Sequence, residues 1–595
     1  MRLLSRAYVA MRLLRSSRMT EEVIVGIRNE ISSIVRRLMR KFATILLSAT
    51  YLSLFSYAVQ EKSSTTPVFT SGTNFVQVPV IVQRSGRHVS GLKRENFIVR
   101  QDGRDQPVAS FEEIHRGANL SNPESKAEAS QAGPTRQQIT IIALDTVDTP
   151  NLDRAYFTDQ FQRYLTRSGG FGGPIALVAI ERSGIHVLRE FTNDPRALLS
   201  AITKDANAQP TANNNSISDI RDFSDALISQ SQTQLANVPD AGPTVADALR
   251  LRSADEAMIR FQDRSSRLDT LYAVQQLAQA LKGLPGRKSL LLVGSGFKFI
   301  DSNTVMKSIS GGSGGIDLNY SVENVGQTMN QTLYTWKLLN DANVAVYPID
   351  TRRTVNSAFN TMDPSVKNTP SDLSFEQNRQ ADRDVLDSFK TMAAATGGKP
   401  CFYRTDLDNC VREAVDDDHD YYLLGFYVDK KNSQPGWHKI DVKLEEKASV
   451  RYRQGFMIAK FNPEAQRKTD LGLALSSPFA YTELPFTGRF DSVDGKSAKF
   501  TLMIPPEAIT VDESTGHIDF DVVAIARAAG GKEAGRVAQH VDRKFPRQSV
   551  AEIMQIGINY SNRMELASGD YGVWFVVRDN LGGRTGSAVV PLKVP

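Results

Sequence analysis

The residues whose types and spacing could do chemistry lie at the end of one apolar run. Six consecutive residues, Ile139–Leu144, are apolar or β-branched, which is typical of a strand buried on both faces of a parallel sheet. The run ends in Asp145-Thr-Val-Asp-Thr149, and a helical pattern opens at Asn151, a favourable N-cap. Carboxylates and hydroxyls in this place lie where open α/β sheets bind ligands. The structural alternative is that Asp145 and Thr149 only cap the following helix.

The chain around this run alternates predicted strands with predicted helices. Such alternation indicates a mostly parallel, Rossmann-like doubly wound sheet that helices cover on both faces. Two polar stretches, 205–240 and 355–378, are interpreted as insertions into this α/β region. The six predicted strands are Ile139–Leu144, Ile175–Ile180, Ile185–Phe191, Lys288–Val293, Val344–Asp350 and Cys401–Tyr403.

Antiparallel strand patterns lie on both sides of the α/β region, which spans 138–419. Residues 75–115 and 420–460 each alternate apolar and polar positions, and we expect them to pair into one β-domain built from both flanks. Residues 59–74 and 116–137 are polar linkers. In the last segment, 461–595, Tyr571, Val573, Phe575 and Val577 share one strand face, and the strand spacing predicts an immunoglobulin-like sandwich.

The charge balance argues against a nucleic-acid partner. The formal net charge is +5, but ten Lys and Arg against three Glu lie before Phe42, so the rest of the chain carries about −2. Behind this basic stretch, Ala43–Ala58 is apolar and ends in Ser56-Tyr57-Ala58. Residues 1–58 are therefore interpreted as a signal peptide region cleaved after Ala58, with an uncleaved anchor as the alternative. The expected location is secreted, periplasmic or cell envelope, with membrane contact only through this segment.

The two cysteines, Cys401 and Cys410, suit an exported protein. They are candidates for one disulfide, because disulfides persist in oxidising compartments. Two buried thiols on a strand and its following helix are the alternative, since spacing alone does not place two Cα atoms within bridging distance.

The patterns of the common catalytic sites are absent from the sequence. The seven histidines are scattered, and none forms a ligand pair at helical spacing. Ser295 lies in Val-Gly-Ser-Gly-Phe and not in a Gly-x-Ser-x-Gly nucleophile elbow. A nucleophilic Cys401 would need a histidine and an orienting partner brought by the fold. We therefore expect no enzyme, with an uncharacterised hydrolase as the remote alternative.

Two acidic features have structural interpretations. Asp350 ends an apolar strand, and we expect it to pair with Arg352 or Arg353. The segment Asp416–Asp420 is interpreted as a solvated loop, with Ca²⁺ binding as the alternative.

Several short segments together resemble one family. Their order and spacing over about residues 70 to 460 are similar to the acidobacterial VWFA-related domain family. The resemblance implies an envelope or secreted protein with a von Willebrand factor A-like fold, and it carries fold further than function. The segments are Gly91–Phe97 with Gln101-Asp-Gly103, Leu281–Lys288, Tyr347–Asp350, Ala395–Gly398 and Tyr421–Tyr427.

The resemblance also implies a candidate metal site. The family fingerprint Asp-x-Ser-x-Ser here reads Asp145-x-Val147-x-Thr149, so the middle hydroxyl is missing. Thr270 matches the threonine of the second metal loop, and Ser295 stands where the third loop would carry an aspartate. The implied ligands of Mg²⁺ or Ca²⁺ are thus Asp145, Thr149 and Thr270, and we expect no cofactor other than such an ion.

These observations predict a non-enzymatic, adhesion-type protein. It would engage a protein or cell-surface ligand through a strand-end rim with a degenerate metal site, because loops at strand ends carry function with or without metal. The alternative is a structural envelope or assembly protein whose α/β rim is inert. The rim residues are Asp145, Asp148, Thr149, Thr270 and Ser295.

Overall fold

The computed structural model describes the chain in nine stretches. Two compact units divide the chain, Met1–Ser71 and Gly72–Pro595, and all described residues belong to the second. The predicted signal region, both linkers and most of the two predicted insertions lie outside the described residues. The described stretches are 75–115, 139–147, 149–167, 173–207, 265–295, 318–352, 372–428, 434–458 and 463–595.

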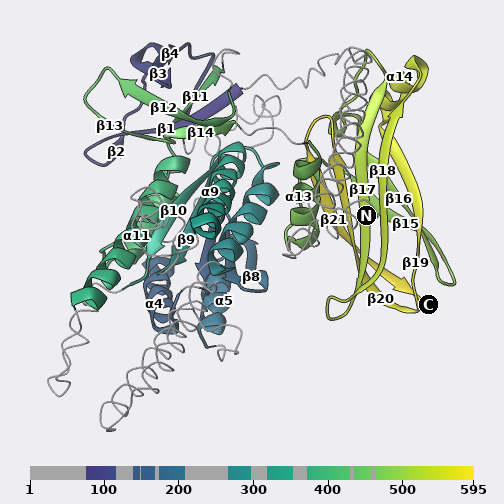
Figure 1. Ribbon diagram of the computed structural model, residues 1–595, viewed down its shortest axis with the longest axis horizontal. Helices are drawn as coiled ribbons and strands as arrows, with labels where there is room; N and C mark the ends of the chain where they lie inside the picture. The colour runs from purple at the N-terminus through teal and green to yellow at the C-terminus, as the bar shows by residue number, and fades with distance from the viewer. Residues whose placement is uncertain are drawn as a thin grey trace, which may run out of the picture. The chain divides into compact units, whose positions relative to one another are not determined.

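The described chain is a mixed α/β protein with one mixed sheet and several antiparallel sheets (Figure 1). The mixed sheet has the strand order β10-β9-β6-β7-β8. Its neighbours are parallel except for β7 and β8, which form an antiparallel hairpin at one edge. The strands are β6 Ile139–Asp145, β7 Ile175–Glu181, β8 Gly184–Thr192, β9 Lys288–Gly294 and β10 Val344–Asp350.

Helices cover both faces of the mixed sheet because its strands are apolar on both faces. Ile141 and Ala143 of β6 belong to one buried cluster, and Ile142 and Leu144 belong to another. The first cluster includes side chains of the helix over 265–281, α9 and α11, and the second includes those of α4, α5 and α12. These helices are α4 Asn151–Arg167, α5 Pro195–Asn207, the helix over 265–281, α9 Leu318–Asp341, α11 Asp372–Thr396 and α12 Leu407–Asp416.

Three details differ from the sequence predictions. The predicted sixth strand is wrong: Cys401 makes only an isolated parallel bridge to Ile349, and the chain leaves the extended conformation at Tyr403, which has a φ of 55°. Helix α4 already includes Asn151, so this residue lies in the first turn and is not the cap before it. The end of the second predicted insertion, from Asp372, is helical.

The expected pairing between the two flanks is present. Strand β1 pairs with β11, β5 pairs with β11, and β3 pairs with β12, so strands on either side of the α/β region share two antiparallel sheets and one core. The sheets have the orders β13-β1-β11-β5, with β2 paired to β1, and β14-β12-β3-β4. The elements are β1 Phe75–Arg84, β2 Arg87–His88, η1 Arg94–Asn96, β3 Phe97–Gln101, β4 Arg104–Gln106, β5 Ser110–Ile114, β11 Tyr421–Tyr427, β12 Gly436–Leu444, β13 Ser449–Tyr452 and β14 Gly455–Ile458.

The C-terminal segment contains two further antiparallel sheets that share a core. Their orders are β15-β16-β19 and β18-β17-β20-β21. Val573, Phe575 and Val577 of β20 are buried in this core with Tyr571 packed against it, so the predicted shared face is confirmed. The elements are α13 Pro463–Ser476, β15 Thr487–Asp494, β16 Ser497–Ile504, η3 Pro506–Ala508, β17 His517–Ala528, β18 Glu533–Lys544, α14 Arg547–Ile556, β19 Ile558–Glu565, β20 Gly569–Asp579 and β21 Thr585–Val594.

No helix in the described stretches combines the length and the apolar composition needed to cross a bilayer.

Candidate functional site

The C-terminal ends of β6 and β9 meet at the point where the strand order reverses. The chain proceeds from β6 to β7 and β8 on one side, and β9 and β10 lie on the other. Open α/β sheets bind ligands outside the carboxyl ends of strands at such a switch point. Here the backbone N–H of Ser295 donates to Thr149 Oγ1 (3.1 Å), and that of Val147 donates to Asp145 Oδ1 (3.0 Å). The structure therefore brings Thr149 and Ser295 together across the two central strands.

Two threonine hydroxyls at the carboxyl edge are buried without a hydrogen-bond partner among the described residues. Thr270 lies on the helix over 265–281, and Thr351 directly follows β10, where its N–H donates to the carbonyl of Gly294 (3.2 Å). Within the described stretches neither Oγ1 has a hydrogen-bond partner. A buried hydroxyl left unpaired costs about 1–3 kcal/mol, so such groups mark sites where another ligand would satisfy them. Sequence reasoning missed Thr351, although its position immediately after the predicted strand end was a usable signal.

The expectation that the rim side chains are exposed is wrong. Asp145 and Thr270 are 0% exposed, Thr149 is 1% exposed and Ser295 is 5% exposed. The cause is the turn after β6, in which Val147 points into the core cluster of the first sheet face. The apolar side chain that replaces the expected hydroxyl thus draws the loop inward. Asp148 lies outside the described residues.

The three residues that the sequence predicts as metal ligands carry donors of the type that a hard divalent cation takes. They are the carboxylate of Asp145 and the hydroxyls of Thr149 and Thr270, oxygen ligands of the kind that Mg²⁺ and Ca²⁺ prefer. The unpaired Thr270 Oγ1 is the observation that favours a bound group. Because a single carboxylate supplies little charge and Val147 supplies no oxygen, the set is suited to weak binding.

Asp350 has the structural role that the sequence predicts. Arg352 donates to it through Nη2 (2.8 Å to Oδ2) and Nε (2.9 Å to Oδ1), and its backbone N–H donates as well. This side-chain pair holds the carboxylate at the end of β10. The alternative partner, Arg353, lies outside the described residues.

The interpretation of Asp416–Asp420 as a solvated loop is wrong, because its central residues are buried in a charge network. Asp418 pairs with Arg287, and Asp417 pairs with Arg451. Tyr347 links the two pairs: it accepts from Arg287 Nη2 (2.8 Å) and donates to Asp417 Oδ2 (3.0 Å). Burial raises the pKa of Tyr347 to about 12. Both aspartates already have cationic partners, so the role of the segment is structural: its ion pairs hold it against Arg287 and Arg451.

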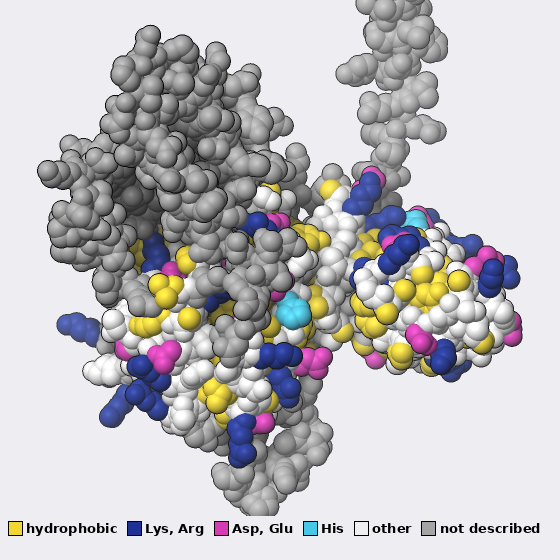
Figure 2. Space-filling model, turned by 90° about the horizontal axis from the view of Figure 1, so that it is seen from below, with side chains coloured by type: hydrophobic (Ala, Val, Ile, Leu, Met, Phe, Trp, Pro, Cys, Tyr) yellow, Lys and Arg dark blue, Asp and Glu magenta, His cyan; other side chains and the backbone are white. Residues whose placement is uncertain are grey.

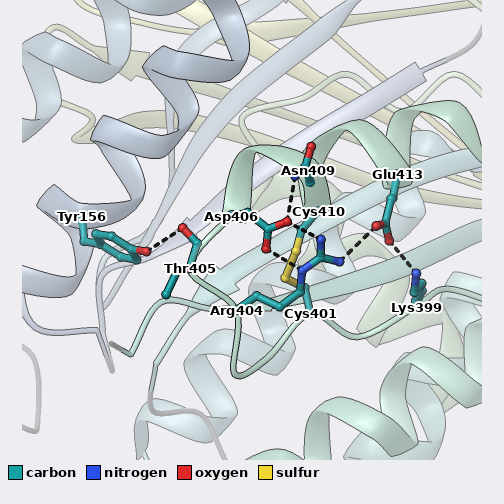
Figure 3. The surroundings of a disulfide bond; sticks show 9 residues. All are labelled: Tyr156, Lys399, Cys401, Arg404, Thr405, Asp406, Asn409, Cys410 and Glu413. Carbon is teal, nitrogen blue, oxygen red and sulfur yellow. Dashed lines mark hydrogen bonds and ion pairs between the residues drawn. A yellow bond between two sulfur atoms is a disulfide. The ribbon is translucent and has the colours of Figure 1, made fainter. Parts of the chain in front are cut away.

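Cys401 and Cys410 form the candidate disulfide, with Cα atoms 6.1 Å apart (Figure 3). Polar contacts surround it. Arg404 bridges Asp406 (Nη2–Oδ2 2.6 Å) and Glu413 (Nη1–Oε1 3.0 Å), and Tyr156 donates from α4 to the carbonyl of Thr405 (3.0 Å). Hydrogen bonds from Arg404 hold the pKa of Asp406 far below its usual value. Cys401 in the disulfide offers no thiolate, so it is not a nucleophile.

The fold brings together histidines that the sequence leaves scattered. His88 and His115 meet around Glu113, and His540 lies between Asp519 and Asp542. No local spacing could reveal either group, since each joins different strands. Figure 2 shows basic and acidic side chains interspersed on the face in view, with His side chains among them.

Comparison with known proteins adds no assignment. No protein-family model matches the chain, and a search of curated proteins finds no match.

Proposed function

We propose that this is an exported, non-enzymatic binding protein that engages a protein or cell-surface ligand at the C-terminal edge of a von Willebrand factor A-like α/β domain. The single observation that carries the proposal is the hydrogen bond that joins the ends of β6 and β9 at the switch point, from Ser295 N–H to Thr149 Oγ1. On the helix over 265–281, the Thr270 hydroxyl is buried without a hydrogen-bond partner among the described residues. Because these groups are buried, they would hold the edge that the ligand contacts from within the protein.

The strand order supports the finer fold. The order β10-β9-β6-β7-β8, with an antiparallel hairpin at the β8 edge and helices on both faces, is that of a doubly wound sheet. The resemblance to the VWFA-related domain family points the same way. In the C-terminal segment, two antiparallel sheets around one core support a sandwich of immunoglobulin type.

Two observations support export without catalysis. The Cys401–Cys410 disulfide suits an oxidising compartment, which agrees with the predicted signal region 1–58. Ser295 engages Thr149 through its backbone N–H, and no described histidine is its hydrogen-bond partner. The edge thus offers positioning oxygens, and we infer docking and not turnover. Mg²⁺ or Ca²⁺ would be held by Asp145, Thr149 and Thr270.

The experiment compares substitutions at the two ends of the same strands. The site variant is Asp145→Asn with Thr270→Val, and the matched control is Thr140→Val with Ser289→Ala, at the N-terminal ends of β6 and β9. Purified proteins are mixed with envelope fragments of the producing cells, and the bound fraction is measured by sedimentation with and without EDTA. We expect the control to bind like the unmodified protein and the site variant to lose retention. Equal retention of all three proteins would contradict the proposal.

A further inference from the structure

A second cluster of ligand-type side chains lies in the β-domain built from both flanks. His88 ends β2, Glu113 lies on β5, and His115 follows β5. Glu113 and His115 are two residues apart in extended chain, so they point to the same side. One ligand atom from each of the three side chains lies within 4.8 Å of the others. Two imidazoles and a carboxylate are thus gathered around one point.

The side chains are oriented for a shared ligand. His115 Nε2 lies 2.9 Å from Glu113 Oε1, and His88 Nε2 lies 3.6 Å from the same oxygen, beyond hydrogen-bond distance. In the described part of the chain, neither ring nitrogen of His88 has a hydrogen-bond partner, and both are buried. Aromatic stacking on Tyr422, with ring centroids 5.4 Å apart, holds the His88 ring in place. A buried imidazole held rigid beside a carboxylate is arranged to coordinate.

Contacts with surrounding residues hold the other two side chains, Glu113 and His115, in place. Glu113 accepts from the Tyr422 hydroxyl (2.7 Å) and from the Gly91 N–H (2.9 Å). His115 turns its second nitrogen, Nδ1, toward Asp420 Oδ1 (3.4 Å). A ligating histidine commonly faces a carboxylate with its other nitrogen, and a ligating carboxylate is commonly hydrogen-bonded. Burial raises the pKa of Glu113, but the hydrogen bonds from Tyr422 and Gly91 hold it below its usual value.

We propose that His88, Glu113 and His115 bind one divalent transition-metal ion of the Zn²⁺ class, with Asp420 positioning His115. Nitrogen ligands select such ions over Mg²⁺ and Ca²⁺, which prefer oxygen. Three protein ligands leave a fourth tetrahedral position for water or an exogenous ligand. On binding, the ion replaces the contact between His115 Nε2 and Glu113 Oε1, and the neutral imidazole of His115 keeps its proton on Nδ1, the nitrogen that faces Asp420. The inference does not depend on the proposed function of the sheet edge.

The site would couple metal binding to closure of the β-domain. Its three ligands come from the N-terminal flank, whereas Asp420 and Tyr422 come from the C-terminal flank, before and within β11. The two flanks meet through the pairing of Glu113 with Tyr422. The outer contacts from Tyr422 and Asp420 exist only once β5 and β11 pair, so the ion stabilises the joined flanks by mass action.

A comparable group on the β17–β18 hairpin supplies a matched control. His540 Nδ1 lies 3.0 Å from Asp521 and 3.6 Å from Asp519. Asp521 is already paired with Arg467 and with the Asn580 amide, and Asp542 is paired with His517. Asp521 and Asp542 are therefore engaged by basic side chains outside the group, whereas Glu113 accepts from the neutral Tyr422 hydroxyl and Gly91 N–H. His540 is also more exposed than His88.

The test measures Zn²⁺ binding to the metal-stripped protein. After EDTA treatment and its removal, equilibrium dialysis against ZnCl₂ with elemental analysis should give one tightly bound ion per chain. His88→Gln and His115→Gln should each abolish tight binding, and Asp420→Asn should weaken it by about 10- to 100-fold, the range for an outer partner. His540→Gln should leave binding unchanged.

Several results would overturn the proposal. These are an unmodified protein that binds no Zn²⁺, tight binding that survives the His88→Gln/His115→Gln double substitution, or binding lost only with His540→Gln. If the histidine variants do not fold, X-ray absorption of the Zn²⁺-loaded unmodified protein decides: it should show two imidazole ligands and no sulfur, and a shell without imidazole refutes the site.

Discussion

The two ends of the mixed sheet differ in how their buried polar side chains are satisfied. At the N-terminal end of β9, Arg287 is paired with Asp418 and bonded to Tyr347, and Asp417 is paired with Arg451. At the C-terminal end, the Thr270 and Thr351 hydroxyls are buried without hydrogen-bond partners among the described residues. Paired groups stabilise one geometry, whereas an unpaired hydroxyl costs stability until a ligand meets it. The difference separates an end whose buried charges are paired from an end with unsatisfied hydroxyls, which is the end at which we propose ligand binding.

The largest expected effect comes from breaking the charge network. Arg287→Leu leaves Asp418 buried without its cation, and removal of one partner of a buried pair costs about 3–5 kcal/mol. Urea unfolding followed by tryptophan fluorescence measures the loss. The control is Arg84→Leu, whose side chain is 56% exposed in its pair with Glu446, itself 48% exposed; an exposed pair contributes about 0–1 kcal/mol. Equal losses in both variants would refute the structural role of the N-terminal end.

The disulfide should contribute next, because it ties α12 to the residue that bridges β10 at the C-terminal end. Its cysteines are 9 residues apart, and closing a loop of that length stabilises by about 2–3 kcal/mol. Reduction should therefore lower the melting temperature of the unmodified protein, as scanning calorimetry would show. A Cys401→Ala/Cys410→Ala variant should have the melting temperature of the reduced, unmodified protein, and added reductant should not change it. Free thiols titrated in the folded, unreduced protein would contradict the bond.

Lys288 gives the N-terminal end a pH dependence. Burial lowers the pKa of this side chain to about 8, against about 10.4 in an unfolded chain. Between these values the unfolded state binds more protons, so stability rises with pH, by about 2 kcal/mol from pH 7.5 to 9.5. Lys288→Met should flatten that rise in urea unfolding at several pH values. The control is Lys439→Met, at an exposed position, which should keep the rise of stability with pH. If the rise persists in Lys288→Met, the titration of Lys288 is not its cause.

The smallest expected effect, that of Thr270→Val, gives the most direct test of the difference between the two ends of the sheet. Thr270→Val removes a buried hydroxyl without a described partner while it keeps the shape, so the metal-free protein should gain roughly 1 kcal/mol. Thr335→Val is the matched control, because its hydroxyl accepts from Gln275 (2.9 Å) and donates to the Gln331 carbonyl (2.8 Å), and it should lose stability. Thermal unfolding with Mg²⁺ or Ca²⁺, the ions that prefer oxygen ligands, completes the test: a shift in the unmodified protein should vanish in Thr270→Val. Destabilisation by Thr270→Val without metal would contradict the interpretation of the C-terminal end.

The elements that sequence patterns predict well are those with strong apolar periodicity. The continuous apolar runs of β6, β9 and β10 identify strands buried on both faces, and the alternation in β20 identifies its inward face. Strand β18 was not predicted because polar residues occupy most of its positions, and its order comes from pairing along β17. Pairing partners are invisible to local periodicity.

The candidate sites divide in the same way. The sequence by itself determined which residues stand at strand ends, since Asp145, Ser295 and Asp350 follow directly from where the apolar runs stop. Only the tertiary structure decided that Val147 turns inward, that Asp417 and Asp418 are buried against arginines, and that His88 meets Glu113 and His115. The physical reason is that burial and charge pairing depend on contacts between segments far apart in the chain, whereas strand and helix signals arise between near neighbours.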